Sequence, residues 1–181
     1  MSPDAFVLPL KRFDLAKERL RASNVDAVTE LAQRLATDVI VSCRPRHTIV
    51  LSESDEITVF ATALGCEVLH SDATGLNDAV QRAYGALTSR FERLIIVHGD
   101  LRDPEGLGRF DPDDDITIVT DHRGLGTNVM ALPTGLDFRF AYGANSASLH
   151  VQEAERLGIR ATVIADSPWR FDVDEPDDLT P

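Results

Sequence analysis

The chain has 181 residues, of which 43% are hydrophobic, 27% charged and 6% aromatic, and its formal net charge is −12 at pH 7. This length and composition predict a single globular domain over residues 1–181, with a core built mainly from aliphatic side chains. The negative charge repels phosphate backbones and argues against a nucleic-acid partner, although one nucleotide needs only a few local cations and a metal ion.

The sequence shows no pattern typical of a secreted or membrane protein. Its first residues, MSPDAFVLPLKRF, lack a charged segment followed by a long apolar run, and no stretch approaches the roughly 20 apolar residues of a membrane span. Cys43 and Cys66 have no close spacing, so they indicate neither a disulfide framework nor a zinc site. Free buried thiols suit a reducing compartment, and we expect a cytoplasmic protein with no membrane partner.

Short apolar runs alternate with helical patterns along the chain. In chain order we predict a strand at 5–10, a helix at 24–44, a strand at 47–52, a helix within 52–65, a strand at 66–70, a helix within 71–87, strands within 93–100, 115–121 and 127–133, a helix within 145–158 and a strand within 160–166. Asn24 or Asp26 can cap the first of these helices.

Strands separated by helices predict an α/β domain with a mainly parallel sheet. The run Leu94–Val97 is entirely apolar, as expected for a strand that is covered on both faces. Ligands of open parallel sheets bind beyond the carboxyl ends of the strands. The loops that follow the predicted strands are therefore where functional residues are expected.

Three aspartates near predicted strand ends form a candidate metal site. Asp100 directly follows the most apolar strand, and Asp172 and Asp174 belong to the segment FDVD, in which alternate residues share one face. Carboxylates without thiols or histidines favour Mg²⁺ or Mn²⁺, which serve phosphoryl or nucleotidyl transfer. The alternatives are that Asp100 caps a helix and that residues 175–178 are an acidic first helical turn, and we accept the second for those residues.

Cations gather in one loop of this otherwise acidic chain. Lys11, Arg12, Lys17 and Arg19 lie within nine residues after the first predicted strand, which suits phosphate binding. The alternative is a helix that exposes them to solvent. Asn77 follows a glycine turn, where its amide can either cap a helix or contact a purine edge.

Two glycine segments can present polar groups to an anion. The first, GLGTN, presents Thr127, and the second places Gly143 and Ser146 at a predicted helix N-terminus. His150 lies one turn after Ser146 on the same helix face, where a structural contact is the more common role. The chain lacks the G-x-S-x-G, G-x-x-x-x-G-K-[ST] and G-x-G-x-x-G motifs, which weakens hydrolase, P-loop and Rossmann dinucleotide interpretations.

Six short motifs lie in a characteristic order over about residues 5–179. They are P-x-K with A-K-x-R-L (Pro9 to Leu20), G-L-N (Gly75 to Asn77), G-D-L (Gly99 to Leu101), G-T-N (Gly126 to Asn128), Y-G-x-x-S-x-x-x-H (Tyr142 to His150) and D-V-D-x-P-x-D-L (Asp172 to Leu179). This set resembles the CofC/FbiD family of guanylyltransferases, within the MobA-like nucleotidyltransferase superfamily.

The resemblance implies a fold and an activity. The fold would be a three-layer α/β/α arrangement with a mostly parallel, mixed sheet of the MobA-like, Rossmann-like kind. The activity would be transfer of GMP from GTP to a small phosphorylated three-carbon acid, with release of pyrophosphate, in coenzyme F-420 biosynthesis. The acceptors implied are 2-phospho-L-lactate, phosphoenolpyruvate and 3-phospho-D-glycerate.

The resemblance also implies roles for individual residues. By matching motif, Asp100, Asp172 and Asp174 would hold Mg²⁺, or Mn²⁺ instead, and would act in catalysis with Lys17. The residues carried over for GTP are Pro9, Lys11, Lys17, Arg19, Gly75 and Asn77. Those carried over for the acceptor acid are Thr127, Gly143 and Ser146. A homodimer is expected only by the same resemblance.

Four positions depart from the family pattern, namely Glu18, His98, Arg102 and Ala147. We expect them to affect contacts with the acceptor and the phosphates and to leave the metal site intact. Two alternatives stay open: a nucleotidyltransferase with another acceptor or with CTP or ATP as donor, and a non-catalytic nucleotide-binding domain of the same fold. A binding domain has no need of all three aspartates.

Overall fold

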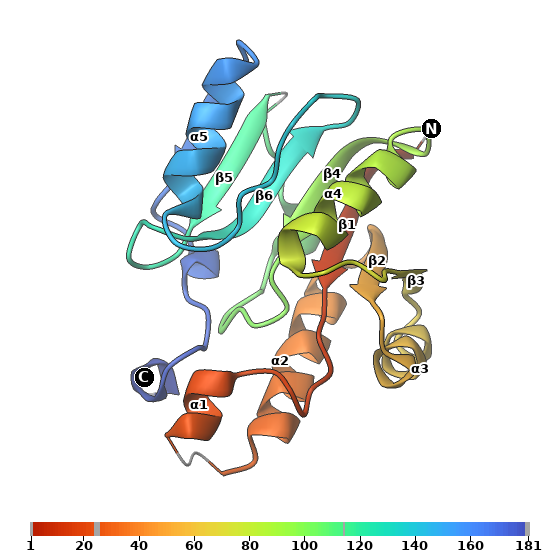
Figure 1. The fold of residues 1–181 in the computed structure, drawn as a ribbon, viewed down its shortest axis with the longest axis vertical. Coiled ribbons are helices and arrows are strands. Elements are labelled where there is room, and N and C mark those ends of the chain that lie inside the picture. Colours follow the sequence, from red (N-terminus) through yellow and green to blue (C-terminus); the bar gives the residue numbers. More distant parts are fainter. Residues whose placement is uncertain (1, 24–25, 114, 180–181) are drawn as a thin grey trace.

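The computed structural model describes residues 2–23, 26–113 and 115–179. Its centre is a seven-stranded sheet in the order β3-β2-β1-β4-β6-β5-β7 (Figure 1). The strands are β1 (Ser2–Pro9), β2 (His47–Ser52), β3 (Glu67–His70), β4 (Phe91–Val97), β5 (Ile116–Thr120), β6 (Thr127–Pro133) and β7 (Ala161–Ile164). Strand β6 is antiparallel to both of its neighbours, β4 and β5, and the other pairs are parallel. The predicted mixed, mostly parallel sheet is therefore confirmed.

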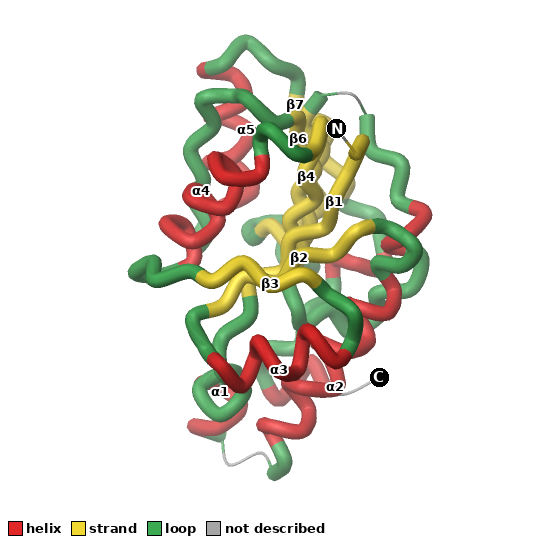
Figure 2. Tube along the Cα trace, turned by 90° about the vertical axis from the view of Figure 1, so that its right-hand side faces the viewer, coloured by secondary structure: helices red, strands yellow, loops and turns green. Residues whose placement is uncertain are grey.

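Helices cover both faces of this sheet, giving three layers (Figure 2). The helices are α1 (Glu18–Ala22), α2 (Val28–Ser42), α3 (Asp55–Ala63), α4 (Leu76–Leu87) and α5 (Ser146–Arg156). Buried side chains of α2 and α3 belong to the core on one face, and those of α4 and α5 to the core on the other. In the part of the chain that the structure describes, no helix combines the length and the apolar character that crossing a membrane requires.

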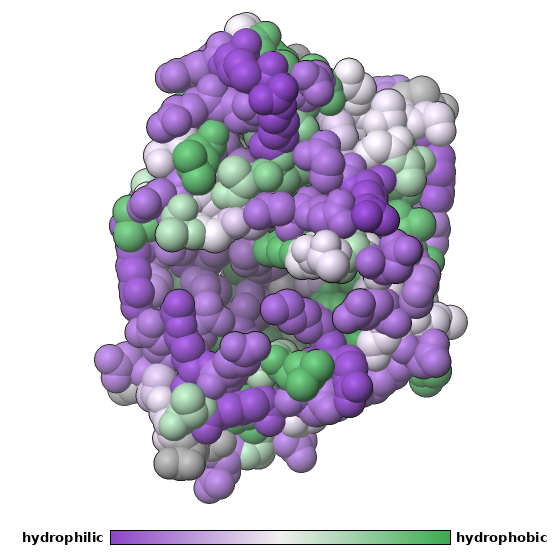
Figure 3. All heavy atoms as spheres, in the orientation of Figure 1, coloured by the Kyte–Doolittle hydropathy of each residue, from purple (hydrophilic) through white to green (hydrophobic). Residues whose placement is uncertain are grey.

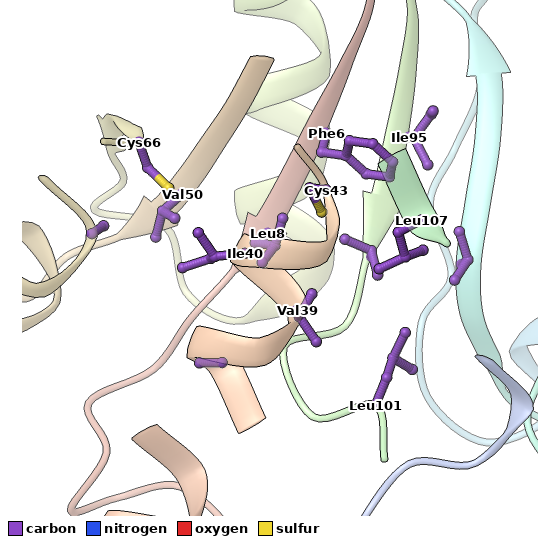
Figure 4. Close-up of a cluster of buried hydrophobic side chains, with 14 of the residues drawn as sticks. Phe6, Leu8, Val39, Ile40, Cys43, Val50, Cys66, Ile95, Leu101 and Leu107 are labelled. Carbon is purple, nitrogen blue, oxygen red and sulfur yellow. The ribbon is translucent and has the colours of Figure 1, made fainter. Parts of the chain in front are cut away.

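The two cores follow from the alternation of side chains along the strands. In β1, Phe6 and Leu8 pack toward α2 (Figure 4), whereas Ala5 and Val7 pack toward the layer of α4. All four side chains are almost completely buried. Burying a large aliphatic or aromatic side chain contributes about 1.5–3 kcal/mol, so each face of the central strands contributes to stability.

Most predicted elements are confirmed, with shifts at their ends. The first strand starts at Ser2, before the predicted start at residue 5. The first long helix starts at Val28, and its N-cap is Ala27, with no side-chain capping bond, so the prediction of Asp26 as the cap is wrong. Asn24, the other predicted cap, lies outside the described residues. The capping prediction fails because Ala27 enters the helix from a left-handed conformation, with φ 53°.

One glycine makes a close backbone contact that fixes the loop after β4. Gly108 lies in the 3-10 turn Leu107–Arg109, and a Cβ at this position would lie 1.9 Å from the carbonyl oxygen of Arg44. By contrast, Gly85 lies on the exposed side of the last turn of α4, with no heavy atom within 4 Å of the corresponding Cβ position.

We expect Gly108→Ala to lower the free energy of unfolding by about 2 kcal/mol or more, because the backbone must move to admit the methyl group. Gly85→Ala is the matched control and is expected to raise that free energy by about 0.5–1 kcal/mol, since alanine favours the helix. Urea unfolding of both variants is the measurement. Equal stabilities would contradict the close packing at Gly108.

Candidate active site

Three carboxylates converge at the edge of the sheet. Asp100 lies in the turn that follows β4, and Asp172 and Asp174 come from the segment near the C-terminus. One ligand oxygen from each of the three residues lies within 4.8 Å of the others. The predicted convergence of these carboxylates is therefore present in the structure.

The C-terminal segment is held in place by backbone pairing. The amide of Arg102 donates to the carbonyl of Phe171 at 2.7 Å, and the amide of Val173 donates to the carbonyl of Asp100 at 3.0 Å. This pairing forms only an isolated antiparallel bridge between Leu101 and Asp172 and no named strand. The extended backbone nevertheless gives the alternation that the sequence predicts for FDVD.

The valine between the two aspartates anchors this segment. Val173 is 3% exposed and packs in a small separate core with Leu20 of α1 and with Val28 and Leu35 of α2. Its neighbours in the sequence therefore face the other way, toward Asp100. The pattern D-V-D thus combines one apolar anchor with two carboxylates in three residues.

Lys17 supplies the counter-charge to this cluster. Its Nζ donates to a carboxylate oxygen of Asp100 and to Oδ1 of Asp174, the latter at 2.9 Å, and its side chain is only 6% exposed. Lys17 is the N-cap of α1 in a left-handed conformation, with φ 59°. This conformation costs a residue other than glycine about 1–2 kcal/mol, so the surrounding contacts hold Lys17 in place against strain.

The carboxylates perturb one another's pKa. Burial raises the pKa of Asp172, and the negative charges of Asp100 and Asp174 raise it further. Burial alone would also raise the pKa of Asp100, but the positive charge of Lys17 and the nearby His98 outweigh it and lower that pKa. The pKa of Lys17 is raised, because its two carboxylate partners outweigh the effect of burial.

The polar surroundings of the cluster fit a hard cation. Oδ1 of Asp100 is buried and has no hydrogen-bond partner among the described residues. Asn128 donates through Nδ2 to Oδ1 of Asp172 at 3.3 Å and to the carbonyl of Trp169 at 3.1 Å, which orients that carboxylate. Three oxygen donors, one of them lacking a partner, are a donor set suited to Mg²⁺ or Mn²⁺. Sequence reasoning missed Asn128, although it closes the G-T-N motif.

A cleft of about 590 Å³ opens beside the carboxylates. Its walls come from the loops after β1, β2, β3 and β4 and from the start of α4, at the carboxyl ends of these strands, and Figure 3 shows a hollow in this face of the molecule. Its lining includes four of the predicted GTP residues, namely Pro9, Lys11, Lys17 and Gly75. Such a volume lies within the usual range for small-molecule sites.

Two predicted GTP residues have other partners and are not among the described residues that line this cleft. Arg19 is 68% exposed in its side chain and donates to Oε1 of Glu175 at 3.1 Å. Asn77 donates to the carbonyl of Tyr142 at 3.0 Å and accepts from its amide at 2.6 Å. The amide of Asn77 thus ties α4 to the loop before α5, and its contact with guanine stays a prediction.

Two of the predicted acceptor residues, Thr127 and Ser146, form a buried polar group with His150. Oγ1 of Thr127 lies 3.3 Å from Oγ of Ser146 and 3.1 Å from Nδ1 of His150. Thr127 and Ser146 are each 2% exposed, and His150 is 0% exposed. Gly143, the third predicted residue, has φ 130°, a conformation that favours glycine, and its carbonyl accepts from the amide of Ser146 at 3.2 Å.

A β-bulge places this polar group beside the carboxylates. Pairing between β5 and β6 shifts from Val119 with Val129 to Thr120 with Thr127, so Asn128 is the extra residue. Asn128 reaches the C-terminal segment, whereas Thr127 reaches α5. Two consecutive residues therefore contact two different parts of the site.

The four departures from the family pattern lie around this site. His98 and Glu18 line the cleft. The guanidinium of Arg102 lies 4.6 Å from the ring centre of Phe171, next to Asp172 in the chain. Ala147 is buried at the start of α5, where its amide donates to the carbonyl of Leu125 at 3.0 Å.

We expect Lys17→Met to lower the free energy of unfolding in metal-free buffer by about 3 kcal/mol or more, because Asp100 would then be buried without its counter-charge. Adding Mg²⁺ should restore part of this loss. Lys11→Met is the control, since Lys11 is exposed, lines the same cleft and has no ion pair among the described residues. Urea unfolding with and without Mg²⁺ is the measurement, and equal losses in the two variants would contradict the role of Lys17.

Comparison with known proteins assigns this chain to a family. Residues 5–181 match the family described as Guanylyl transferase CofC like. A phosphoenolpyruvate guanylyltransferase of Chloroflexus aurantiacus is 29% identical in an alignment 186 residues long, gaps included. The alignment covers 96% of this chain and 91% of that protein. A 2-phospho-L-lactate guanylyltransferase of Methanocaldococcus fervens is 25% identical over 180 residues, which cover 96% of this chain and 81% of that protein.

A solved structure shares the fold. A nucleotidyl transferase from Methanothermobacter thermautotroptrophicus superposes with a TM-score of 0.68 at 16% identity, covering 98% of this chain and 94% of that one. The fold is therefore the expected MobA-like α/β fold. Because the family match extends from the first strand to the end of the chain and includes all three aspartates, this protein belongs to the CofC-like guanylyl transferase family.

Proposed function

We propose that this protein transfers GMP from GTP to a small phosphorylated three-carbon acid and releases pyrophosphate, as a step in coenzyme F-420 biosynthesis. The observation that carries this proposal is the convergence of Asp100, Asp172 and Asp174 beside the cleft. Family membership and the names of the relatives support GTP as donor and phosphoenolpyruvate or 2-phospho-L-lactate as acceptor. 3-Phospho-D-glycerate is a third acid of the same chemical class.

In this proposal the three aspartates hold Mg²⁺, with Mn²⁺ as an alternative. Bound there, such an ion neutralises negative charge on the phosphates. Asn128 keeps the Asp172 carboxylate oriented. Lys17 exchanges its carboxylate partners for phosphate oxygens when the nucleotide enters, since a lysine ammonium is a mobile point charge on a flexible stem.

The remaining residues bind and align the two substrates. Lys11 and Lys17 lie along the triphosphate, and the backbone at Pro9 and Gly75 lines the nucleotide cleft. Thr127 at the start of β6, together with Gly143 and Ser146 at the N-terminus of α5, holds the acid. An oxygen of the acceptor phosphate attacks the α-phosphorus of GTP, so that a new P–O bond forms while the bond to the β-phosphate oxygen breaks and pyrophosphate leaves. No covalent intermediate on the protein is needed, and rate enhancement comes from alignment and charge neutralisation.

We further propose that one domain carries this activity. A single sheet contains all the strands of the described residues, and Lys17 near one end of the chain contacts Asp174 near the other. We also propose a cytoplasmic location, because Cys43 and Cys66 are free and buried and GTP is an intracellular nucleotide.

We expect purified protein with Mg²⁺ and GTP to release pyrophosphate with at least one of 2-phospho-L-lactate, phosphoenolpyruvate and 3-phospho-D-glycerate. Each acid is tested separately, with mass spectrometry of the product and with ATP and CTP as donor controls. A product formed with ATP or CTP but not with GTP would contradict the donor assignment. If folded protein binds GTP but stays inactive with all three acids, the acceptor assignment is wrong, and another acid or a non-catalytic nucleotide-binding domain is favoured.

We expect Asp172→Asn to lower kcat by about a hundredfold or more, because it removes a charge that neutralises the cation bound to the phosphates. The substitution keeps the shape of the side chain. Asp177→Asn is the matched control, since Asp177 is an exposed acid of the same C-terminal segment outside the carboxylate cluster. Steady-state pyrophosphate release is the measurement, and an unchanged rate in Asp172→Asn would show that the metal assignment is wrong.

A further inference from the structure

In the buried group of Thr127, Ser146 and His150, the imidazole is bonded through both of its ring nitrogens. We propose that His150 is a positioning residue that sets the direction of the hydrogen bonds in this group, so that one hydroxyl proton is left to donate to an anionic oxygen of the acceptor acid. This inference rests on the proposed function, because it concerns the acceptor site. His150 itself does not touch the substrate.

The backbone of Ala141 fixes which nitrogen of His150 carries the proton. The amide of Ala141 donates to Nε2 of His150 at 3.0 Å, and a backbone N–H can only donate, so Nε2 is unprotonated. Burial lowers the pKa of His150 to about 4, with the nearby His98 adding to the shift, so the ring is neutral at pH 7. A neutral ring without a proton on Nε2 carries it on Nδ1. Nδ1 therefore donates to Oγ1 of Thr127 at 3.1 Å.

A count of protons then shows that one donor is left over. The group has three polar protons, on Nδ1 of His150 and on the hydroxyls of Thr127 and Ser146, but only two hydrogen bonds join these atoms. If Thr127 donates to Ser146, the proton of Ser146 is left, and in the reverse case the proton of Thr127 is left. Neither hydroxyl has another acceptor among the described residues. A buried donor without an acceptor is costly, so this proton is available to a ligand.

The position of the leftover proton favours an anionic ligand. Ser146 is the first residue of α5, an 11-residue helix, whose N-terminus carries partial positive charge. Thr127 directly precedes Asn128, which donates to the carboxylate of Asp172. The buried group is thus joined through one peptide bond to a residue that contacts the carboxylate cluster, and we place the acceptor acid between the two, where its phosphate can reach the nucleotide. If the proton of His150 were on Nε2, the bare Nδ1 would accept a hydroxyl proton, and the group would have no proton left to donate.

Two substitutions of His150 test the hydrogen bond to Thr127 and the hydrogen bond from Ala141 separately. In His150→Asn the side-chain amide can still donate to Thr127 from the position of Nδ1, but it cannot reach Ala141. In His150→Gln the amide oxygen can still accept from Ala141 in the position of Nε2, and the donor to Thr127 is lost. We expect His150→Gln to raise the KM for the acceptor acid by about tenfold or more, with the KM for GTP unchanged within about twofold.

His150→Asn should keep the KM for the acceptor within about threefold of the wild-type value, even if it is the less stable of the two variants. Circular dichroism and thermal unfolding measure the stability of each variant. A purely structural role predicts that the less stable variant is also the more impaired, for both substrates alike. That result, or equal acceptor KM values in the two variants, would overturn the inference.

Nuclear magnetic resonance of the substrate-free wild-type protein tests the proton position without any turnover. Long-range ¹H–¹⁵N spectra distinguish the two neutral forms of histidine, and His150→Gln identifies the His150 signal among the five histidines of the chain. We expect a protonated Nδ1 and a bare Nε2. A proton on Nε2 would overturn the inference.

A titration separates failure of this inference from failure of the proposed function. Phosphoenolpyruvate, 2-phospho-L-lactate and 3-phospho-D-glycerate are added separately to wild-type protein and to His150→Gln while the spectra of the proteins are followed. If the wild type binds an acid but does not turn it over, the proposed function fails, and tenfold weaker binding by His150→Gln still supports the role of His150. Equal binding by both proteins, or no binding of any of the three acids to the wild type, overturns the inference.

Discussion

The contacts of Lys17 with two aspartates connect the parts of this molecule that form the site. Asp100 follows the fourth strand, Asp174 lies near the C-terminus, and Lys17 starts the first helix. Three carboxylates so close together repel one another, and burial adds to the cost of their charge. One ammonium group makes the arrangement stable in the free protein. In the function we propose, the same cation follows the phosphates of a nucleotide, so that a single residue serves folding and binding in turn.

The position of the C-terminal segment is set by contacts outside the sheet. Val173 packs between α1 and α2, and two backbone bonds join the segment to the turn after β4. The cost of ordering these last residues is therefore offset by apolar burial and not by the ligands themselves. The carboxylates of Asp172 and Asp174 are thus oriented before any metal ion or nucleotide arrives, which reduces the entropy lost on binding.

Sequence reasoning predicted the layers of the fold and the three aspartates, because both depend on local patterns. Apolar runs such as Leu94–Val97 mark buried strands, and alternation within three residues is enough to place Asp172 and Asp174 on one side. The partner of Asn77 could not be predicted in this way, because Tyr142 lies 65 residues further along the chain. The direction of the bonds at His150 likewise depends on a backbone amide whose position only the folded chain defines.

The bulge in β6 has a consequence for how the specificity of this enzyme family can diversify. Thr127 and Asn128 are joined by one peptide bond, yet Thr127 contacts His150 of α5 and Asn128 contacts Asp172 of the carboxylate cluster. A change in the backbone path of β6 would therefore disturb the contact of Thr127 with α5 and the contact of Asn128 with Asp172 together. The loop before Thr127 and the first turn of α5 contribute no residue to the carboxylate cluster. With Thr127 and Ser146 holding the acceptor acid as we propose, new acceptors are gained by mutation in those two segments, while the carboxylate cluster is inherited unchanged.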